Sequence, residues 1–160
     1  MTSSSWPRPN RYGVFTRDQC EVWELLAKDA APTTRQQRFV TPSAEILIVQ
    51  GGPRAWYASA GYSLHSGDMR TFGGNPHAAR EDRYPSCEAA LRAMAEWLLE
   101  RMGDVFRESE KERSVPLRFK GAHHRIAQTE LQEAEHVARW AARLAGVDVP
   151  PAMEQLELFA

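Results

Sequence analysis

The sequence has few cysteines and no long apolar run. Its 160 residues include only two cysteines, Cys20 and Cys87, which lie far apart and outside any Cys-x-x-Cys pair. This spacing argues against a disulfide framework and against a zinc site, and we expect both thiols to stay reduced. The first residues lack a basic start followed by an apolar core, and no apolar stretch approaches the length of a membrane span. The sequence therefore predicts a cytoplasmic protein without membrane contact.

The short motifs that commonly carry catalysis or nucleotide binding are also missing. The chain contains no Gly-x-Ser-x-Gly, no phosphate-binding Walker loop, no dinucleotide-binding glycine pattern after a strand, and no His-Glu-x-x-His. The glycine pairs Gly51-Gly52 and Gly73-Gly74 lie among turn-forming residues instead. We therefore assign no catalytic residue and expect no cofactor, which favours a non-enzymatic protein.

Neither sign of charge is in excess. The chain has 20 lysine and arginine residues against 21 aspartate and glutamate residues, for a net charge of −1. This balance provides no overall field that would draw the chain to DNA or to an anionic membrane. Hydrophobic residues make up 42% and charged residues 26% of the sequence, which is typical of one folded domain and not of a disordered chain.

A helix start is recognisable near the N-terminus. Residues 16–19, Thr-Arg-Asp-Gln, have the form of a capping box, in which two side chains satisfy backbone donors at the start of a helix. Val22, Leu25 and Leu26 follow at helical spacing, and Pro32 would stop a helix. The pattern predicts a first helix between the capping box and this proline.

The middle of the sequence predicts an antiparallel hairpin. Ile46–Val49 is a short, continuous, mostly β-branched apolar run, which is typical of a buried strand. Gly51–Arg54 supplies a turn, and from Trp56 to Leu64 apolar side chains alternate with small or polar ones, as in a strand with one apolar face. Arg38–Val40 before the hairpin and Met69–Phe72 after it are candidate outer strands.

Two further helices are predicted in the second half. Ser86 is a good N-cap for the first of them. Its apolar positions recur at helical spacing: Leu91, Met94, Leu98, Met102 and Val105. The charged run Glu108–Arg113 predicts a solvated connection, and Val115–Phe119 an extended segment because proline disfavours helix before it. A second capping box at residues 129–132 predicts the last helix. One face of that helix carries Ala134, Val137, Ala141 and Leu144.

Together these elements predict an α+β fold, in which a small antiparallel sheet of two to four strands packs against two or three helices. Residues 1–13 are rich in serine, proline and arginine and show no apolar periodicity, so we expect a flexible arm. A single domain is expected over residues 14–146, and a tail over residues 147–160.

Two groups of side chains are candidate sites in the body. His65, Asp68 and His77 form a candidate metal cluster near the end of the hairpin, but their spacing matches no paired-ligand motif, and we expect no metal site. A local basic patch surrounds Phe119, a mixture of charge and stacking surface that suits single-stranded nucleic acid. The patch consists of Arg113, Arg118, Lys120 and Arg125. The alternative is a solvated loop that balances the neighbouring glutamates.

The tail carries the most specific pattern. Its last residues are Gln155, Leu156, Glu157, Leu158 and Phe159, followed by one alanine. Upstream, a helix-stopping glycine and two consecutive prolines favour an extended segment held away from the body. The alternative is a last helical turn, with Leu156 and Phe159 on one face, that folds back onto the core of the protein.

Gln155, Leu156, Leu158 and Phe159 resemble the short peptide by which many bacterial replication and repair proteins bind the DNA polymerase sliding clamp. That pattern is roughly Gln-Leu, a small or acidic residue, Leu, Phe, and Glu157 occupies its variable centre. The resemblance covers five residues and implies a partner, with no implication for the fold. It implies that the glutamine forms a hydrogen bond at the edge of an apolar groove on the clamp, which the leucines and the aromatic ring fill.

These observations predict a cytoplasmic accessory protein, bacterial or from a phage or plasmid, that docks on the replication sliding clamp through its tail. The body would then either recruit a partner to the clamp or compete with polymerases for the clamp groove. A second hypothesis is a nucleic-acid-binding or regulatory module of a phage or plasmid, which would use Arg8 and Arg11 together with the patch around Lys120. A small metal-dependent enzyme built on His65, Asp68 and His77 is the least favoured alternative.

Overall fold

The fold is α+β, as the sequence predicts. The computed structural model describes residues 5–26, 43–64, 71–72, 74–78, 83–114 and 128–148. In chain order the elements are a short 3₁₀ turn η1 (Arg17–Gln19), strands β1 (Glu21–Leu25), β2 (Ala44–Gly52), β3 (Ala55–Ser63) and β4 (Thr71–Phe72), and helices α1 (Cys87–Ser114) and α2 (Gln128–Ala145). The strands form an antiparallel sheet in the order β1-β2-β3-β4.

The predicted hairpin is confirmed as β2 and β3. Ile46 lies opposite Ala60 and Ile48 opposite Ala58 in the ladder. The outer strand predicted at residues 69–72 corresponds to β4, which pairs with the end of β3. The other predicted outer strand, Arg38–Val40, lies outside the described residues.

The helix predicted after residues 16–19 is wrong. The capping box does form, since the Thr16 backbone N–H donates to Oε1 of Gln19 at 2.9 Å. It supports only the single turn η1, after which the chain enters β1. Trp23 and Leu25 alternate toward the core, and β1 is fully paired with β2. Pairing with a neighbouring strand and burial of alternate side chains therefore override the local helix signal.

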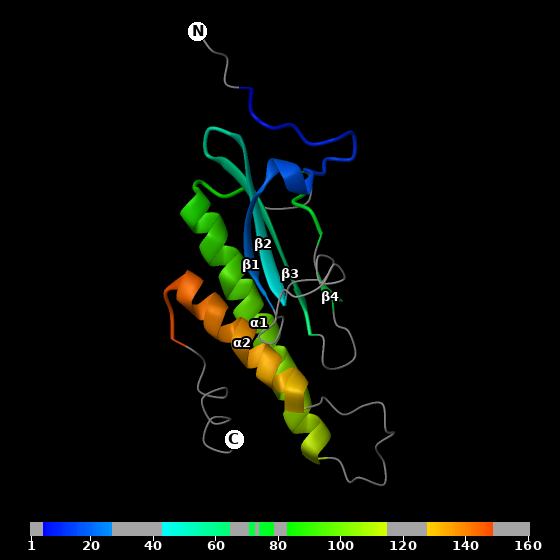
Figure 1. The fold of residues 1–160 in the computed structure, drawn as a ribbon. Coiled ribbons are helices and arrows are strands. Elements are labelled where there is room, and N and C mark those ends of the chain that lie inside the picture. The colour runs from blue at the N-terminus through cyan, green and yellow to red at the C-terminus, as the bar shows by residue number, and fades with distance from the viewer. Residues whose placement is uncertain are drawn as a thin grey trace.

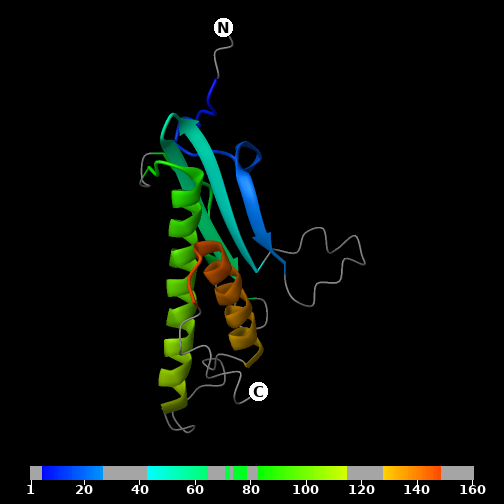
Figure 2. The ribbon, with the colours of Figure 1, turned by 90° about the vertical axis from the view of Figure 1, so that its left-hand side faces the viewer.

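Both helices lie on one side of the sheet (Figures 1 and 2). α1 packs on β2 and β3, continues past the end of the sheet, and packs along its lower half against α2. The core between these layers includes Ile46, Ile48, Leu98, Met102 and Val137, all at most 2% exposed. Neither helix in the described part of the chain is long and apolar enough to cross a bilayer.

The boundaries of α1 confirm one prediction and correct another. Ser86 is its N-cap, and Oγ of Ser86 accepts a hydrogen bond from the Ala89 N–H at 3.1 Å. The run Glu108–Arg113 is not a connection, because α1 continues through Ser114. Glutamate, lysine and arginine have high helix propensity, so a charged surface run prolongs a helix as readily as it forms a loop.

Two chain segments, one around Phe15 and one at residues 74–76, cover the opposite face of the sheet. Leu47 and Val49 point to this face and are each 2% exposed, and Phe15, 1% exposed, lies above the hairpin with its ring 5.3 Å from that of Tyr57. The Phe15 N–H donates to the carbonyl of Pro76, and the Ser59 hydroxyl donates to the carbonyl of Gly74. The continuous apolar run of β2 is thus buried on both sides, as a run without alternation indicates.

Candidate functional site

The proposed docking peptide lies outside the described residues, but the structure shows how the chain leaves the last helix. Gly146 has a φ of 69°, in the left-handed region that favours glycine. Its N–H donates to the carbonyl of Arg143, and the Val147 N–H donates to the carbonyl of Ala142. These two bonds form a Schellman motif, which terminates a helix. The predicted helix stop is confirmed, and Val147, 47% exposed, and Asp148 follow at the surface.

The candidate nucleic-acid contacts in the body are mostly outside the described residues. Arg113 belongs to the last turn of α1, and its side chain is not among those described. Arg118, Lys120 and Arg125 lie in the segment between the two helices, beyond the described ranges. The basic patch around Phe119 therefore stays a prediction.

The candidate metal ligands divide in the same way. His65 and Asp68 lie outside the described residues, whereas His77 forms a β-bridge with Val14 on the face of the sheet away from the helices. Among the side chains that the structure describes, no three histidine, cysteine, aspartate or glutamate residues gather as a metal ion requires.

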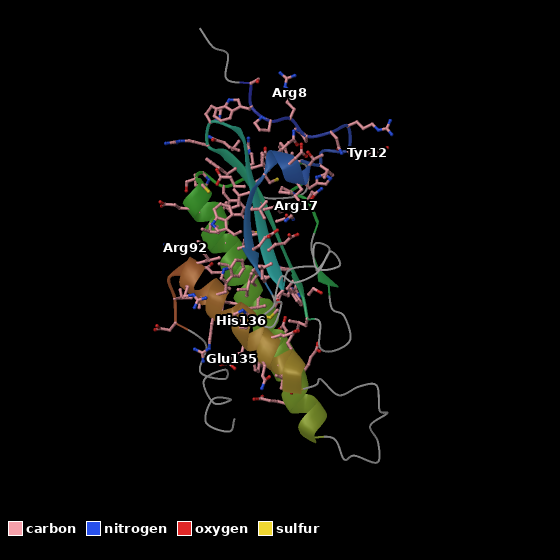
Figure 3. The ribbon with its side chains drawn as sticks, in the orientation of Figure 1. Arg8, Tyr12, Arg17, Arg92, Glu135 and His136 are labelled. Carbon is pink, nitrogen blue, oxygen red and sulfur yellow. The ribbon has the colours of Figure 1, made fainter. Side chains whose placement is uncertain are left out.

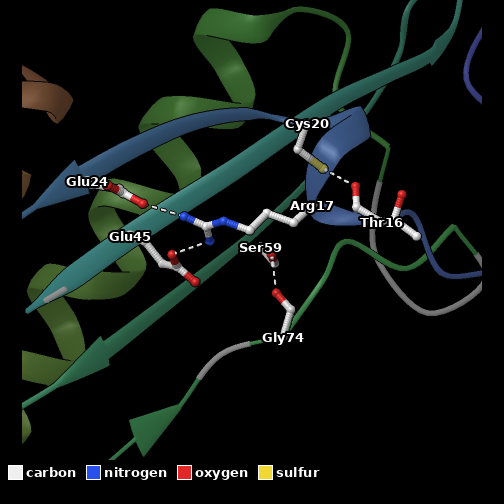
Figure 4. Close-up of polar contacts among 7 residues, drawn as sticks. All are labelled: Thr16, Arg17, Cys20, Glu24, Glu45, Ser59 and Gly74. Carbon is white, nitrogen blue, oxygen red and sulfur yellow. Dashed lines mark hydrogen bonds and ion pairs between the residues drawn. The ribbon is translucent and has the colours of Figure 1, made fainter. Parts of the chain in front are cut away.

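An arginine bridges two glutamates on the face of the sheet away from the helices (Figure 4). Glu24 of β1 and Glu45 of β2 are direct partners in the ladder. Arg17, in η1, donates to Oε1 of Glu24 and, at 2.5 Å, to Oε2 of Glu45. The hydrogen bond that Arg17 donates to Glu45 is the largest cause that raises the pKa of Arg17. Two like charges placed opposite each other destabilise a sheet, and the guanidinium offsets that repulsion.

The two cysteines are free thiols in weakly reactive surroundings. Burial raises the pKa of Cys20 to about 11, although the charge of Arg17 partly opposes the shift. The Cys20 thiol donates to the carbonyl of Thr16 at 3.4 Å (Figure 4). Burial, and then the charge of Glu21, raise the pKa of Cys87. Because the thiolate is the nucleophile, neither position suits nucleophilic chemistry at neutral pH.

The N-terminal segment carries a group of exposed side chains, of which the sequence pattern indicates only the arginines. Trp6 is 36% and Tyr12 65% exposed, and Arg8 and Arg11 are exposed between them. The guanidinium of Arg11 lies 4.7 Å from the centre of the Tyr12 ring. The two arginines were recognised as candidate contacts, whereas the two aromatic residues were not. A signal was present, because the first acidic residue of the chain is Asp18.

Comparison with known proteins adds no further guide to the site. No protein-family model, no curated protein and no solved structure matches this chain.

Proposed function

We propose that this protein docks on the bacterial DNA polymerase sliding clamp through Gln155, Leu156, Leu158 and Phe159. The observation that carries the proposal is the match of these four positions to the clamp-binding peptide. A short linear peptide recognised by a groove needs no particular fold in the protein that carries it. The proposal therefore does not depend on a likeness of the body to any known family.

The end of α2 supports this role for the tail. The Schellman motif at Gly146 stops the helix, and Val147 and Asp148 lie at the surface. Six residues, 149–154, then precede the docking peptide. A segment of that length spans at most about 20 Å when extended, which exceeds the roughly 10–12 Å diameter of a helix. The connection is thus long enough to present the peptide to a partner beyond α2.

The chemistry of the peptide suits moderate affinity. Burial of two leucines and one phenylalanine contributes about 1.5–3 kcal/mol each. Much of this is offset because binding fixes the peptide in one conformation and removes its translational freedom. A micromolar dissociation constant, equivalent to about −8 kcal/mol, is the expected result.

The test measures binding of the full-length protein to a purified bacterial sliding clamp by surface plasmon resonance. The double variant Leu158→Ala with Phe159→Ala removes the two side chains expected to fill the groove. Loss of two such anchors weakens binding by about 30-fold or more. The matched control is Met153→Ala, which shortens an apolar side chain of the same tail outside the motif and leaves affinity unchanged. Equal binding by the wild type and the double variant rejects the proposal.

Clamp docking has two functional consequences, which a second assay distinguishes. If the protein competes with polymerases for the groove, it inhibits clamp-dependent primer extension, and the double variant does not. If the protein recruits another partner, primer extension proceeds at an unchanged rate while the protein stays bound to the clamp.

A further inference from the structure

One end of the molecule combines exposed aromatic rings with arginines. The N-terminal segment passes beside the turn between β2 and β3 (Figures 1 and 3). This turn is at the end of the sheet opposite to the one that α1 runs past. We call the arm end the group of side chains that these two segments present: Trp6, Arg8, Arg11, Tyr12 and Arg54. All five are exposed, and Arg8 and Tyr12 point away from the body in Figure 3.

Hydrogen bonds fix the loop that carries two of these side chains. Oδ1 of Asn10 accepts from the backbone N–H groups of Tyr12 at 2.9 Å and of Val14 at 3.1 Å. The N–H of Asn10 donates to the carbonyl of Val14, and that of Gly13, where φ is 82°, donates to the carbonyl of Asn10. Arg11 and Tyr12 therefore lie on a closed, hydrogen-bonded loop, so less conformational entropy is lost when they bind a partner.

The same segment is fastened to the body on both sides of the loop. Nε2 of Gln19 donates to the carbonyl of Arg8 at 3.2 Å. After the loop, Phe15 is buried against the hairpin, and the Ala78 N–H donates to the carbonyl of Gly13 at 2.8 Å. Residues 8–15 are thus held at this end of the sheet by η1 and by residues 76–78.

The charge at the arm end is of one sign. The chain has no acidic residue before Asp18, and none between Glu45 and Asp68. Within the described part of the chain, no carboxylate forms an ion pair with Arg8, Arg11 or Arg54. The net charge of −1 therefore conceals three arginines at one end of the molecule that no described carboxylate pairs, and such a group attracts anions at short range.

Arg54 has a further feature. It is the one non-glycine residue with positive φ, at 58°, among those that the structure describes. This conformation is uncommon for residues other than glycine, asparagine, aspartate and histidine. The chain thus carries an arginine at an exposed turn position where the backbone alone favours a smaller residue, and such positions concentrate at binding sites.

We propose that the arm end binds single-stranded nucleic acid. Guanidinium groups of Arg8, Arg11 and Arg54 would contact phosphates, and the rings of Trp6 and Tyr12 would stack on bases. Exposed aromatic rings interspersed with arginines are the combination that sequence-tolerant single-strand binding uses. An acidic peptide would use the same charges but gains nothing from base stacking, so the two exposed rings favour nucleic acid.

The test uses the full-length protein and a fluorescently labelled oligodeoxythymidine of about 16 nucleotides, with binding followed by anisotropy. Three phosphate contacts give a slope of about −2 for log affinity against log salt, so the wild type binds about 20-fold more weakly at about 200 mM than at about 50 mM salt. The triple variant Arg8→Gln, Arg11→Gln, Arg54→Gln loses that salt-dependent binding.

Two comparisons separate a local site from general charge. The control triple variant Arg92→Gln, Arg107→Gln, Arg143→Gln removes three exposed arginines of the two helices. Its net charge equals that of the triple variant at Arg8, Arg11 and Arg54. It binds within about twofold of the wild type, because its arginines lie outside the arm end. The variant Trp6→Ala with Tyr12→Ala binds at least about 10-fold more weakly than the wild type, because base stacking is lost. Its salt slope is unchanged, because the charge is retained.

Three outcomes would overturn the proposal. Equal weakening by both triple variants would assign the binding to diffuse charge. Unchanged binding by the Trp6→Ala, Tyr12→Ala variant, together with equal competition by a polyglutamate peptide, would indicate an acidic protein partner. Loss of oligonucleotide binding in the Leu158→Ala, Phe159→Ala variant would assign the contact to the tail. This last variant is expected to bind like the wild type, so failure of clamp docking and failure of the arm end are distinguishable.

Discussion

At the scale of single residues, Arg17 has the clearest structural role. It lies between Glu24 and Glu45, which face each other across β1 and β2. Arg17 and Glu24 are both more than 40% exposed, so solvent screens their attraction and each ion pair is worth less than a buried one. The main effect of Arg17 is to prevent the two carboxylates from facing each other without a counter-charge.

Replacement of Arg17 by glutamine is expected to lower the free energy of unfolding by about 1 kcal/mol at low salt. The double variant Arg17→Gln with Glu24→Gln recovers most of that loss, because one of the two repelling charges is gone. Urea denaturation of the two variants, with the exposed Arg92→Gln as control, measures the difference. If the double variant is no more stable than Arg17→Gln, the repulsion is not what Arg17 relieves.

Cys20 gives a prediction about pH. Burial favours the neutral thiol in the folded protein, and the pKa is raised from 9.0 to about 11. Because the folded protein holds the thiol proton more tightly than the unfolded chain, the contribution of Cys20 to the free energy of unfolding is fully present below pH 9.0. It is lost as the pH rises through about 11. In the Cys87→Ser variant, the reaction rate of Cys20 with a disulfide reagent is expected to rise about tenfold per pH unit from about pH 8 to about pH 10. A rate that levels off near pH 9 would contradict the prediction.

At the scale of elements, two glycines of the helices have opposite roles. Gly146 has positive φ at the end of α2, and no atom lies within 4 Å of the Cβ that alanine would add, so only the backbone resists substitution. Gly103 lies inside α1, and its added Cβ would meet only the flexible guanidinium of Arg107, at 3.4 Å.

Gly146→Ala is therefore expected to destabilise the protein by about 1 kcal/mol, because alanine disfavours the left-handed conformation. Gly103→Ala is expected to stabilise it by about 0.5–1 kcal/mol, because alanine loses less backbone entropy in a helix. Thermal and chemical denaturation of the two variants side by side provide the measurement. The same sign of change in both would show that the two glycines are not distinguished by their backbone conformation.

The elements also show what local sequence patterns reveal. β3 and α1 are recognisable because their apolar side chains recur with the period of the element itself, and β2 because its apolar run is short, continuous and mostly β-branched. Residues 21–25 were misassigned because the capping box at Thr16 is a signal about one turn, whereas the strand state of β1 comes from its pairing with β2. Glu108–Arg113 was misassigned because a charged run has no apolar period and fits a helix surface or a loop equally well.

At the scale of the whole molecule, the two proposed binding regions differ in how far sequence reveals them. The docking peptide is contiguous, so its pattern is readable without a fold. The arm end combines residues 6–12 with Arg54, and only in the folded protein do these segments lie at the same end of the sheet. The continuous apolar run of β2 indicates that this strand is buried on both faces. No sequence pattern indicates that Phe15 packs over one of those faces.

Deletion of residues 149–160 tests whether the tail belongs to the folded body. If the peptide is free for a partner, the deletion changes the free energy of unfolding by less than about 0.5 kcal/mol, as surface changes do, and abolishes clamp binding. If Leu156 and Phe159 fold back onto the core, the loss is about 3 kcal/mol or more, because each buried side chain contributes about 1.5–3 kcal/mol. Urea denaturation of the truncated and full-length proteins distinguishes these results.

The end of α2 at Gly146 also fixes the point at which the body is tethered. With the docking peptide held on the clamp, a connection of only six residues confines the body to a small volume beside it. A linker this short gives effective concentrations in the millimolar range where it can span the two sites. A nucleic-acid contact too weak to persist in free solution would then be occupied for much of the time, and the two weak attachments would act together as one strong one.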